Sequence, residues 1–153
     1  MLTGQCGCGA VTYRLMSEPM SVHCCHCRDC QRQTGSAFVL NALIEAERVN
    51  FHGPVAEATF PSGSGKGQVV TRCAVCGVAL FSAYLIREGK LRNVRVGTLD
   101  QPSACPPDVH IFTASKQPWV MLAGDIPAFE GFYDIAQVWP QDRLARWAAL
   151  FGP

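Results

Sequence analysis

The stretch Gly4-Gln5-Cys6-Gly7-Cys8-Gly9 and its complement Cys73-Ala74-Val75-Cys76-Gly77 decide the fold of this chain. In the second stretch two residues separate the thiols, so both sulfurs can face one ion, and Gly77 permits a tight turn after them. The first stretch is a tighter pair whose glycines let the backbone fold around a metal. Together the two pairs predict a closed tetrahedral site of four thiolates, which would tie the N-terminus to the middle of the chain and contribute to folding.

A second group of thiols lies at Cys25-His26-Cys27-Arg28-Asp29-Cys30. Cys25, Cys27 and Cys30 fall within six residues, so one loop could supply three corners of a tetrahedron. Cys24 is an awkward fourth ligand, because adjacent side chains of extended backbone point to opposite faces, and we favour a position for it in the core. His23 or His26 could complete the site. If no side chain does, water or substrate must, and an open position distinguishes catalytic zinc from structural zinc.

The chain has nine cysteines; with Cys24 counted in the second group, only Cys105 stands apart. Disulfide frameworks are typical of short secreted proteins, whereas this N-terminus has neither the basic region nor the apolar run of an export signal. We therefore expect a cytoplasmic protein whose cysteines bind metal, with two Zn²⁺ ions per chain.

Length and composition predict one domain spanning residues 1–153. Hydrophobic residues make up 48% of the 153 positions, which is enough to bury a core. The formal net charge is +1 and charged residues contribute 16%. This balance disfavours nucleic acid and acidic membranes as partners, and no apolar run reaches the roughly 20 residues of a membrane span. The sequence indicates no oligomeric state.

Apolar alternation predicts a mainly β fold. A polar segment followed by a capping glycine predicts a short helix at Arg28–Thr34, and apolar residues at three- and four-residue spacing predict a terminal helix at Asp142–Phe151. A flexible turn is expected at Pro61–Gly67. The expected strands are 10–15, 37–44, 49–52, 56–60, 68–72, 78–84 and 91–98.

The ligand type narrows the chemistry of the second site. Three thiolates donate much charge to Zn²⁺ and leave a poorer Lewis acid than three histidines would, so hydrolysis is not favoured. A thiolate-rich zinc is suited to binding one more thiol, which coordination deprotonates at neutral pH. The product of that step is a sulfur nucleophile.

Three ordered motifs carry a resemblance to a known family. They are Gly4-x-Cys6-x-Cys8-Gly9, then Cys25-His-Cys27-x-x-Cys30 leading to Gly35-Ser36-Ala37-Phe38, then Cys73-x-x-Cys76-Gly77. This pattern resembles the glutathione-dependent formaldehyde-activating enzyme family, whose domain also occurs in centromere protein V. His110-Ile111-Phe112, Ser115-Lys116 and Trp119 are similar to the C-terminal region of that family. Cys24 is an additional thiol beside the second motif.

The resemblance implies a β-tent, in which small antiparallel sheets surround the zinc sites, with a short C-terminal helix. It implies that Cys6, Cys8, Cys73 and Cys76 bind the structural zinc and that Cys25, Cys27 and Cys30 bind the catalytic one. The implied activity is a carbon–sulfur lyase reaction of the S-(hydroxymethyl)glutathione synthase type, which adds glutathione to formaldehyde. The alternative is a non-catalytic zinc module that binds a protein or nucleic acid.

Glutathione is anionic, so its pocket needs positive charge or backbone donors near the zinc. Arg28 and Arg32 would share one face of the predicted helix and are our candidates, against the alternative of a solvated polar face. Arg72 is a weaker candidate. His110 is either a structural histidine or a site residue, and Trp119, Trp139 and Trp147 are expected in the core.

Overall fold

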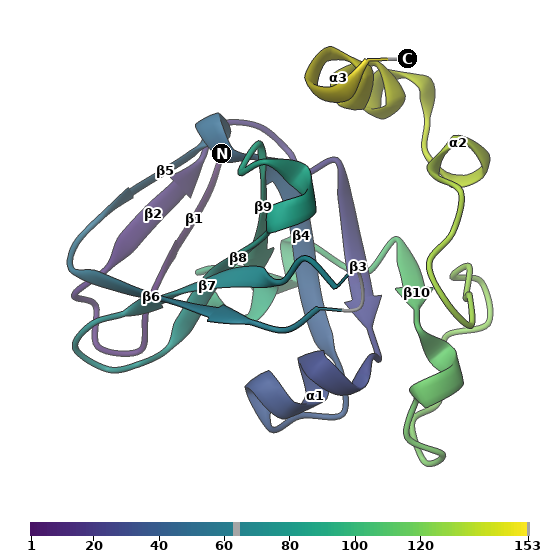
Figure 1. Ribbon diagram of the computed structural model, residues 1–153, viewed down its shortest axis with the longest axis horizontal. Helices are drawn as coiled ribbons and strands as arrows, with labels where there is room; N and C mark the ends of the chain where they lie inside the picture. Colours follow the sequence, from purple (N-terminus) through teal and green to yellow (C-terminus); the bar gives the residue numbers. More distant parts are fainter. Residues whose placement is uncertain (63–64, 153) are drawn as a thin grey trace. The chain divides into compact units, whose positions relative to one another are not determined.

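The structure is a computed structural model that describes residues 1–62 and 65–152. Its described residues are mainly β (Figure 1). The strands are β1 (Leu2–Gln5), β2 (Thr12–Leu15), β3 (Ser21–Cys25), β4 (Val39–Glu45), β5 (Val49–His52), β6 (Val55–Phe60), β7 (Gln68–Cys73), β8 (Ala79–Tyr84), β9 (Leu91–Arg95) and β10 (Val109–Ile111). The α-helices are α1 (Arg28–Thr34), α2 (Ile135–Val138) and α3 (Gln141–Phe151).

The chain divides into two compact units. Unit 1 comprises residues 1–22 and 40–106. It contains a small antiparallel sheet in the order β1-β2-β5 and a run of neighbouring strands in the order β4-β9-β8-β7-β6. The small sheet is tightly packed, because a Cβ atom added at Gly4 would meet the Tyr13 ring at 2.4 Å. Only glycine fits there, at the start of the segment that carries Cys6 and Cys8.

The core of unit 1 forms from the inward faces of these strands. In β2 burial alternates, with Tyr13 and Leu15 buried between exposed neighbours. Phe81 is fully buried and contacts the Tyr13 ring edge-on, with 5.1 Å between centroids. Cys6 and Cys73 belong to the same buried cluster. The four-thiol motif is therefore anchored in the core by one cysteine from each pair.

Unit 2 comprises residues 23–39 and the described part of 107–153. Here β10 runs parallel to the second half of β3, and His110 is in register with Cys24. Helix α1 follows β3 directly and ends at Gly35, whose φ of 67° gives the left-handed cap that the sequence predicts. Trp139 is buried and meets Trp147 of α3 edge-on, at 5.6 Å between centroids.

The predicted fold class is confirmed: the described chain is mainly β, with small sheets and a short C-terminal helix. The predicted strands and both predicted helices lie within a few residues of the observed ones. Among the strands and α-helices of the described residues, β1, β3, β10 and α2 were not predicted. Every residue of β3 is buried, so it lacks the alternation that identifies a half-exposed strand. The single-domain prediction stays a prediction, and the predicted Pro61–Gly67 turn includes Gly63 and Ser64, which lie outside the described residues.

The prediction that Trp119 lies in the core is wrong, because its side chain is 70% exposed.

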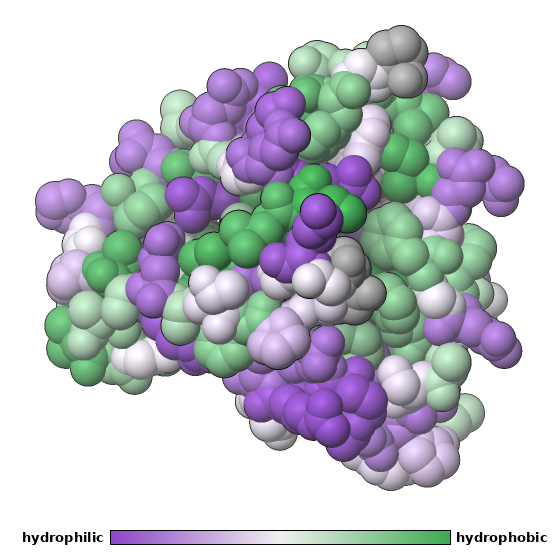
Figure 2. Space-filling model, in the orientation of Figure 1, coloured by the Kyte–Doolittle hydropathy of each residue, from purple (hydrophilic) through white to green (hydrophobic). Residues whose placement is uncertain are grey.

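On the face that Figure 2 shows, apolar and polar residues are interspersed. Within the described residues, none of the helices combines the length and apolar character needed to cross a membrane.

Candidate metal centres

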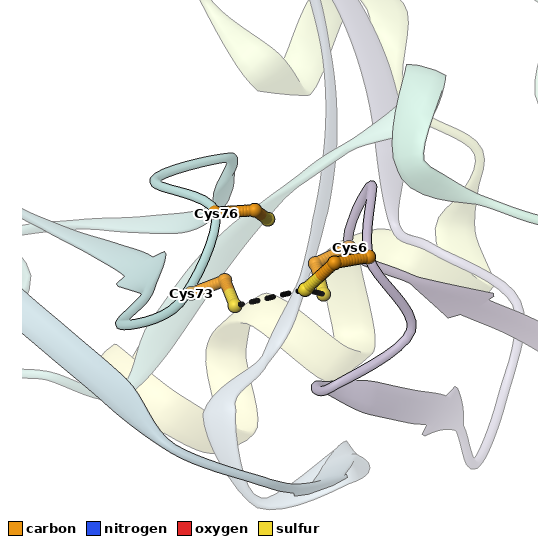
Figure 3. Close-up of side chains that lie close together, drawn as sticks. Cys6, Cys73 and Cys76 are labelled. Atoms are coloured by element: carbon orange, nitrogen blue, oxygen red, sulfur yellow. Dashed lines mark hydrogen bonds between the residues drawn. The ribbon is translucent and has the colours of Figure 1, made fainter.

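The structure brings the four cysteines of the first predicted site together. Their sulfurs all lie within 4.8 Å of one another, although Cys8 and Cys73 are 65 residues apart in sequence. In Figure 3 Cys6, Cys73 and Cys76 converge from the loop after β1 and the turn after β7. All four residues belong to unit 1.

Backbone turns position these sulfurs. In the first loop the Cys6 amide donates to the Val11 carbonyl at 2.9 Å, and the Val11 amide donates back to the Cys6 sulfur at 3.2 Å. In the second, the Gly77 amide donates to the Cys73 carbonyl at 2.9 Å, with φ of 76° at Gly77. Amide donors aimed at a sulfur favour its thiolate form. The Val11 amide therefore favours the thiolate form of Cys6.

The spacing of the four sulfurs fits a tetrahedral ion. Zn–S bonds of 2.3 Å place neighbouring sulfurs about 3.8 Å apart in a regular tetrahedron. The Cys6–Cys8 and Cys8–Cys73 sulfur distances are 3.5 and 3.9 Å. This cluster could hold a metal ion, whereas binding itself stays a prediction.

The second predicted site is also assembled. The sulfurs of Cys25, Cys27 and Cys30 lie within 4.8 Å of one another in unit 2. Cys27 is the N-cap of α1, and its sulfur accepts from the Cys30 amide at 3.4 Å. Among the described residues of this unit, no other histidine, cysteine or acidic side chain joins the three sulfurs within that distance. The cluster thus offers three potential ligands among the described residues.

Two of these thiols, Cys25 and Cys27, differ in their tendency to ionise. Hydrogen bonds from the Cys25 and Cys30 side chains, together with backbone amides, lower the pKa of Cys27 to about 2. The same contact with Cys27 raises the pKa of Cys25, and burial adds to that effect. The contacts of this loop therefore favour the thiolate form at Cys27 over that at Cys25.

The residues considered as a fourth ligand lie elsewhere. Cys24 is 2% exposed and joins a different group, consisting of Cys24, His26 and His110. Burial raises the pKa of Cys24 to about 12 and lowers that of His26 to about 4. The ring of His23 contacts the Tyr133 hydroxyl through Nε2 at 2.9 Å, and this hydroxyl accepts from Trp139 at 2.7 Å. His23 is thus part of a buried aromatic network.

The two candidate arginines lie on α1 as predicted, and both are exposed. Arg28 donates to the side-chain oxygen of Gln31. Within the described residues, neither Arg28 nor Arg32 forms an ion pair. Arg72 lies in unit 1 instead. It donates to the Gly77 carbonyl at 3.2 Å and so contacts the turn that carries Cys73 and Cys76.

Gln31 is a site residue that sequence reasoning missed. It is buried, and its Nε2 donates to the carbonyls of His26 and Ser115 at 2.6 and 3.0 Å. Its Oε1 accepts from Arg28 and, at 2.8 Å, from Gln117. Gln31 therefore connects the cysteine loop to the segment after β10. No sequence signal marks it, because a glutamine in a polar helix is ordinary.

The profile of the glutathione-dependent formaldehyde-activating enzyme family matches residues 1–115. The chain belongs to this family. One relative, from Halomonas elongata, is provisionally named as a glutathione-dependent formaldehyde-activating enzyme; it is 25% identical over 99% of this chain and 97% of its own length. A solved structure of a Rhodobacter sphaeroides protein, a structural genomics target, covers 83% of this chain and 99% of its own, at 17% identity and a TM-score of 0.48.

Family membership agrees with the resemblance read from the cysteine motifs. The three motifs from Gly4 to Gly77 all fall within the matched residues. The segment that carries α2 and α3 lies beyond them.

Proposed function

We propose that this protein is a zinc-dependent enzyme of carbon–sulfur chemistry that adds a small thiol, glutathione in the first instance, to an aldehyde such as formaldehyde. The observation that carries the proposal is the cluster of Cys25, Cys27 and Cys30, which supplies three sulfurs and no fourth protein ligand among the described residues of its unit. Family membership supports the choice of thiol and aldehyde. We propose cytoplasmic localisation with this activity.

The overall reaction balances without a redox partner. The thiol loses its proton, its sulfur forms a bond to the carbonyl carbon, the C=O π bond breaks, and the oxygen takes up a proton to become a hydroxyl. A zinc ion held by Cys25, Cys27 and Cys30 would supply the acidity that deprotonates an incoming thiol at neutral pH. The first cluster, formed by Cys6, Cys8, Cys73 and Cys76, would hold a structural zinc.

The chain's own residues would bind and orient the thiol substrate. Cys27 is the N-cap of α1, so the helix that carries Arg28 and Arg32 begins at the cysteine loop. The side-chain oxygen of Gln31 accepts a hydrogen bond from Arg28, and its nitrogen donates to two backbone carbonyls. Arg28 and Arg32 carry positive charge that no ion pair within the described residues neutralises, which suits the carboxylates of glutathione.

Cobalt substitution tests the proposal directly. Titrating the Co²⁺-loaded protein with glutathione should strengthen the sulfur-to-cobalt charge-transfer band as a fourth sulfur binds. In Cys27→Ser that change and the catalysed formation of S-(hydroxymethyl)glutathione, measured above the uncatalysed rate, should both be lost. Cys105→Ser is the control, because Cys105 belongs to neither cluster. A spectrum of the wild type that stays unchanged at saturating glutathione would refute coordination of the thiol.

A further inference from the structure

A third group of potential ligands lies on the opposite face of the strand that leads into the second site. Side chains alternate between faces along extended backbone, so Cys24 and His26 share one face and Cys25 takes the other. Parallel pairing of β10 with β3 sets His110 beside Cys24, and the His26 amide continues the ladder by donating to Ile111 at 3.0 Å. The register therefore gathers Cys24, His26 and His110 on one face.

These three side chains converge on one point. The Cys24 sulfur lies 3.5 Å from Nε2 of His26, and that nitrogen lies 3.0 Å from Nδ1 of His110. Around a tetrahedral zinc with Zn–N near 2.0 Å and Zn–S near 2.3 Å, such ligand atoms are about 3.3–3.6 Å apart. The observed separations are close to these values. All three residues are buried, with 2%, 0% and 7% of their surfaces exposed.

The two ring nitrogens that converge with the Cys24 sulfur are also close enough to share one hydrogen bond. One proton shared between His26 and His110 satisfies a single nitrogen of each ring. The other two, Nδ1 of His26 and Nε2 of His110, are buried and have no partner among the described residues. Both rings nevertheless direct one nitrogen towards the Cys24 sulfur, which is the arrangement that a shared ion requires.

We infer that Cys24, His26 and His110 form a third metal site, which binds one divalent transition-metal ion of the zinc type. A thiolate and two neutral imidazoles are borderline-soft donors, the set that Zn²⁺ prefers over Mg²⁺ or Ca²⁺. Binding would release the thiol proton of Cys24 to solvent, and the proton shared between His26 and His110 would move to the outer nitrogen of its own ring. The nearby cation is Lys116, whose ammonium is held by the carbonyls of Gln117 and Val120 at 3.1 and 2.8 Å and thus stays off the three ligand atoms.

This site differs from the one to which the proposed function assigns catalysis. Cys25, Cys27 and Cys30 form a separate group, and the inference holds whether or not that group is catalytic. Its role would be structural: one ion would link the strand carrying Cys24 to β10 and hold the two histidines without further hydrogen bonds. Cys24, which has no place in the two predicted sites, thereby gains a function.

Metal content tests the inference. After saturation with Zn²⁺ and gel filtration under reducing conditions, Cys24→Ser and His110→Ala should each bind one equivalent less zinc per chain than the wild type. The control Cys105→Ser replaces a buried cysteine outside every cluster and should lose none. Because the readout is a difference between variants, it does not depend on activity or on the occupancy of the other two sites.

A measurement on the wild type decides the matter if a variant fails to fold. In the wild type, a crystallographic anomalous-difference map at the zinc edge should contain a peak between the Cys24 sulfur and the two ring nitrogens. Absence of that peak in zinc-saturated crystals would overturn the inference. Zinc content in folded Cys24→Ser equal to that of the wild type would overturn it as well.

Discussion

The four-thiol cluster makes a testable prediction about stability. The perturbation is the double substitution Cys8→Ser/Cys76→Ser, which removes one thiol from each pair. Both residues are exposed, whereas Cys6 and Cys73 are buried in the core. The change therefore breaks the cross-link with little loss of packing, and two thiolates remain, too few for a closed site.

The expected magnitude follows from the length of chain that the cross-link closes. Cys8 and Cys73 are separated by 65 residues. By the loop-entropy relation for covalent cross-links, closing a loop of this length contributes about 4 kcal/mol at 25 °C. For a chain of this size each kcal/mol shifts Tm by about 2–4 °C, so the double variant should melt about 8–16 °C lower. Lost metal–sulfur bonding adds to this figure.

Thermal unfolding followed by circular dichroism, in reducing buffer with a molar excess of Zn²⁺, measures the change in Tm. Val75→Ser is the matched control, because Val75 lies in the same turn, is 68% exposed and carries no thiol. Its Tm should stay within about 2 °C of the wild type, as for most surface substitutions. A double variant that melts as high as Val75→Ser, with unchanged zinc content, would show that the four sulfurs do not cross-link the fold through a metal.

Three further predictions concern the fold and the proposed thiol site. Gly53→Ala should lower the free energy of unfolding by at least about 1–3 kcal/mol in urea titrations, because φ is 120° and the added Cβ would lie 2.1 Å from a backbone carbonyl oxygen. Gly97→Ala is the control: open space surrounds Gly97, so the free energy of unfolding should change far less. Phe81→Ala should cost about 3–5 kcal/mol in the same assay because its ring is fully buried, and a loss under about 1 kcal/mol would contradict the described core. Arg28→Ala/Arg32→Ala should raise KM for glutathione about tenfold or more, as expected when charge-assisted hydrogen bonds are lost, with kcat little changed; an unchanged KM would assign both arginines to a solvated face.

Much of the candidate metal centres could be predicted because their cysteines are close together in the sequence, two or three at a time. Cys73 and Cys76 share a tight turn, and Cys25, Cys27 and Cys30 share one strand-to-helix loop, so spacing alone indicates that each group can face one ion. The α1 boundaries were predictable for the same reason, since the glycine cap is a local signal. The family match over residues 1–115 includes all three cysteine motifs.

Contacts between distant segments that no paired cysteine motif marks were beyond reach of the sequence. His110 lies 84 residues from His26, and only the parallel register of β10 against β3 brings their rings together. The short strand β10 has three residues, too few for a recognisable alternation. Gln31 was missed because its partners come from a segment far along the chain.

The sequence by itself determined which residues can bind a metal and which cysteines share one turn. Turn geometry depends on adjacent residues in the sequence, above all on glycine. It also determined the mainly β character, through side-chain alternation. Tertiary structure alone decided the face on which each lone residue lies: it placed Cys24 with two histidines and left Trp119 exposed. The physical reason is that strand register between distant segments is set by packing of the whole core, which no local pattern encodes.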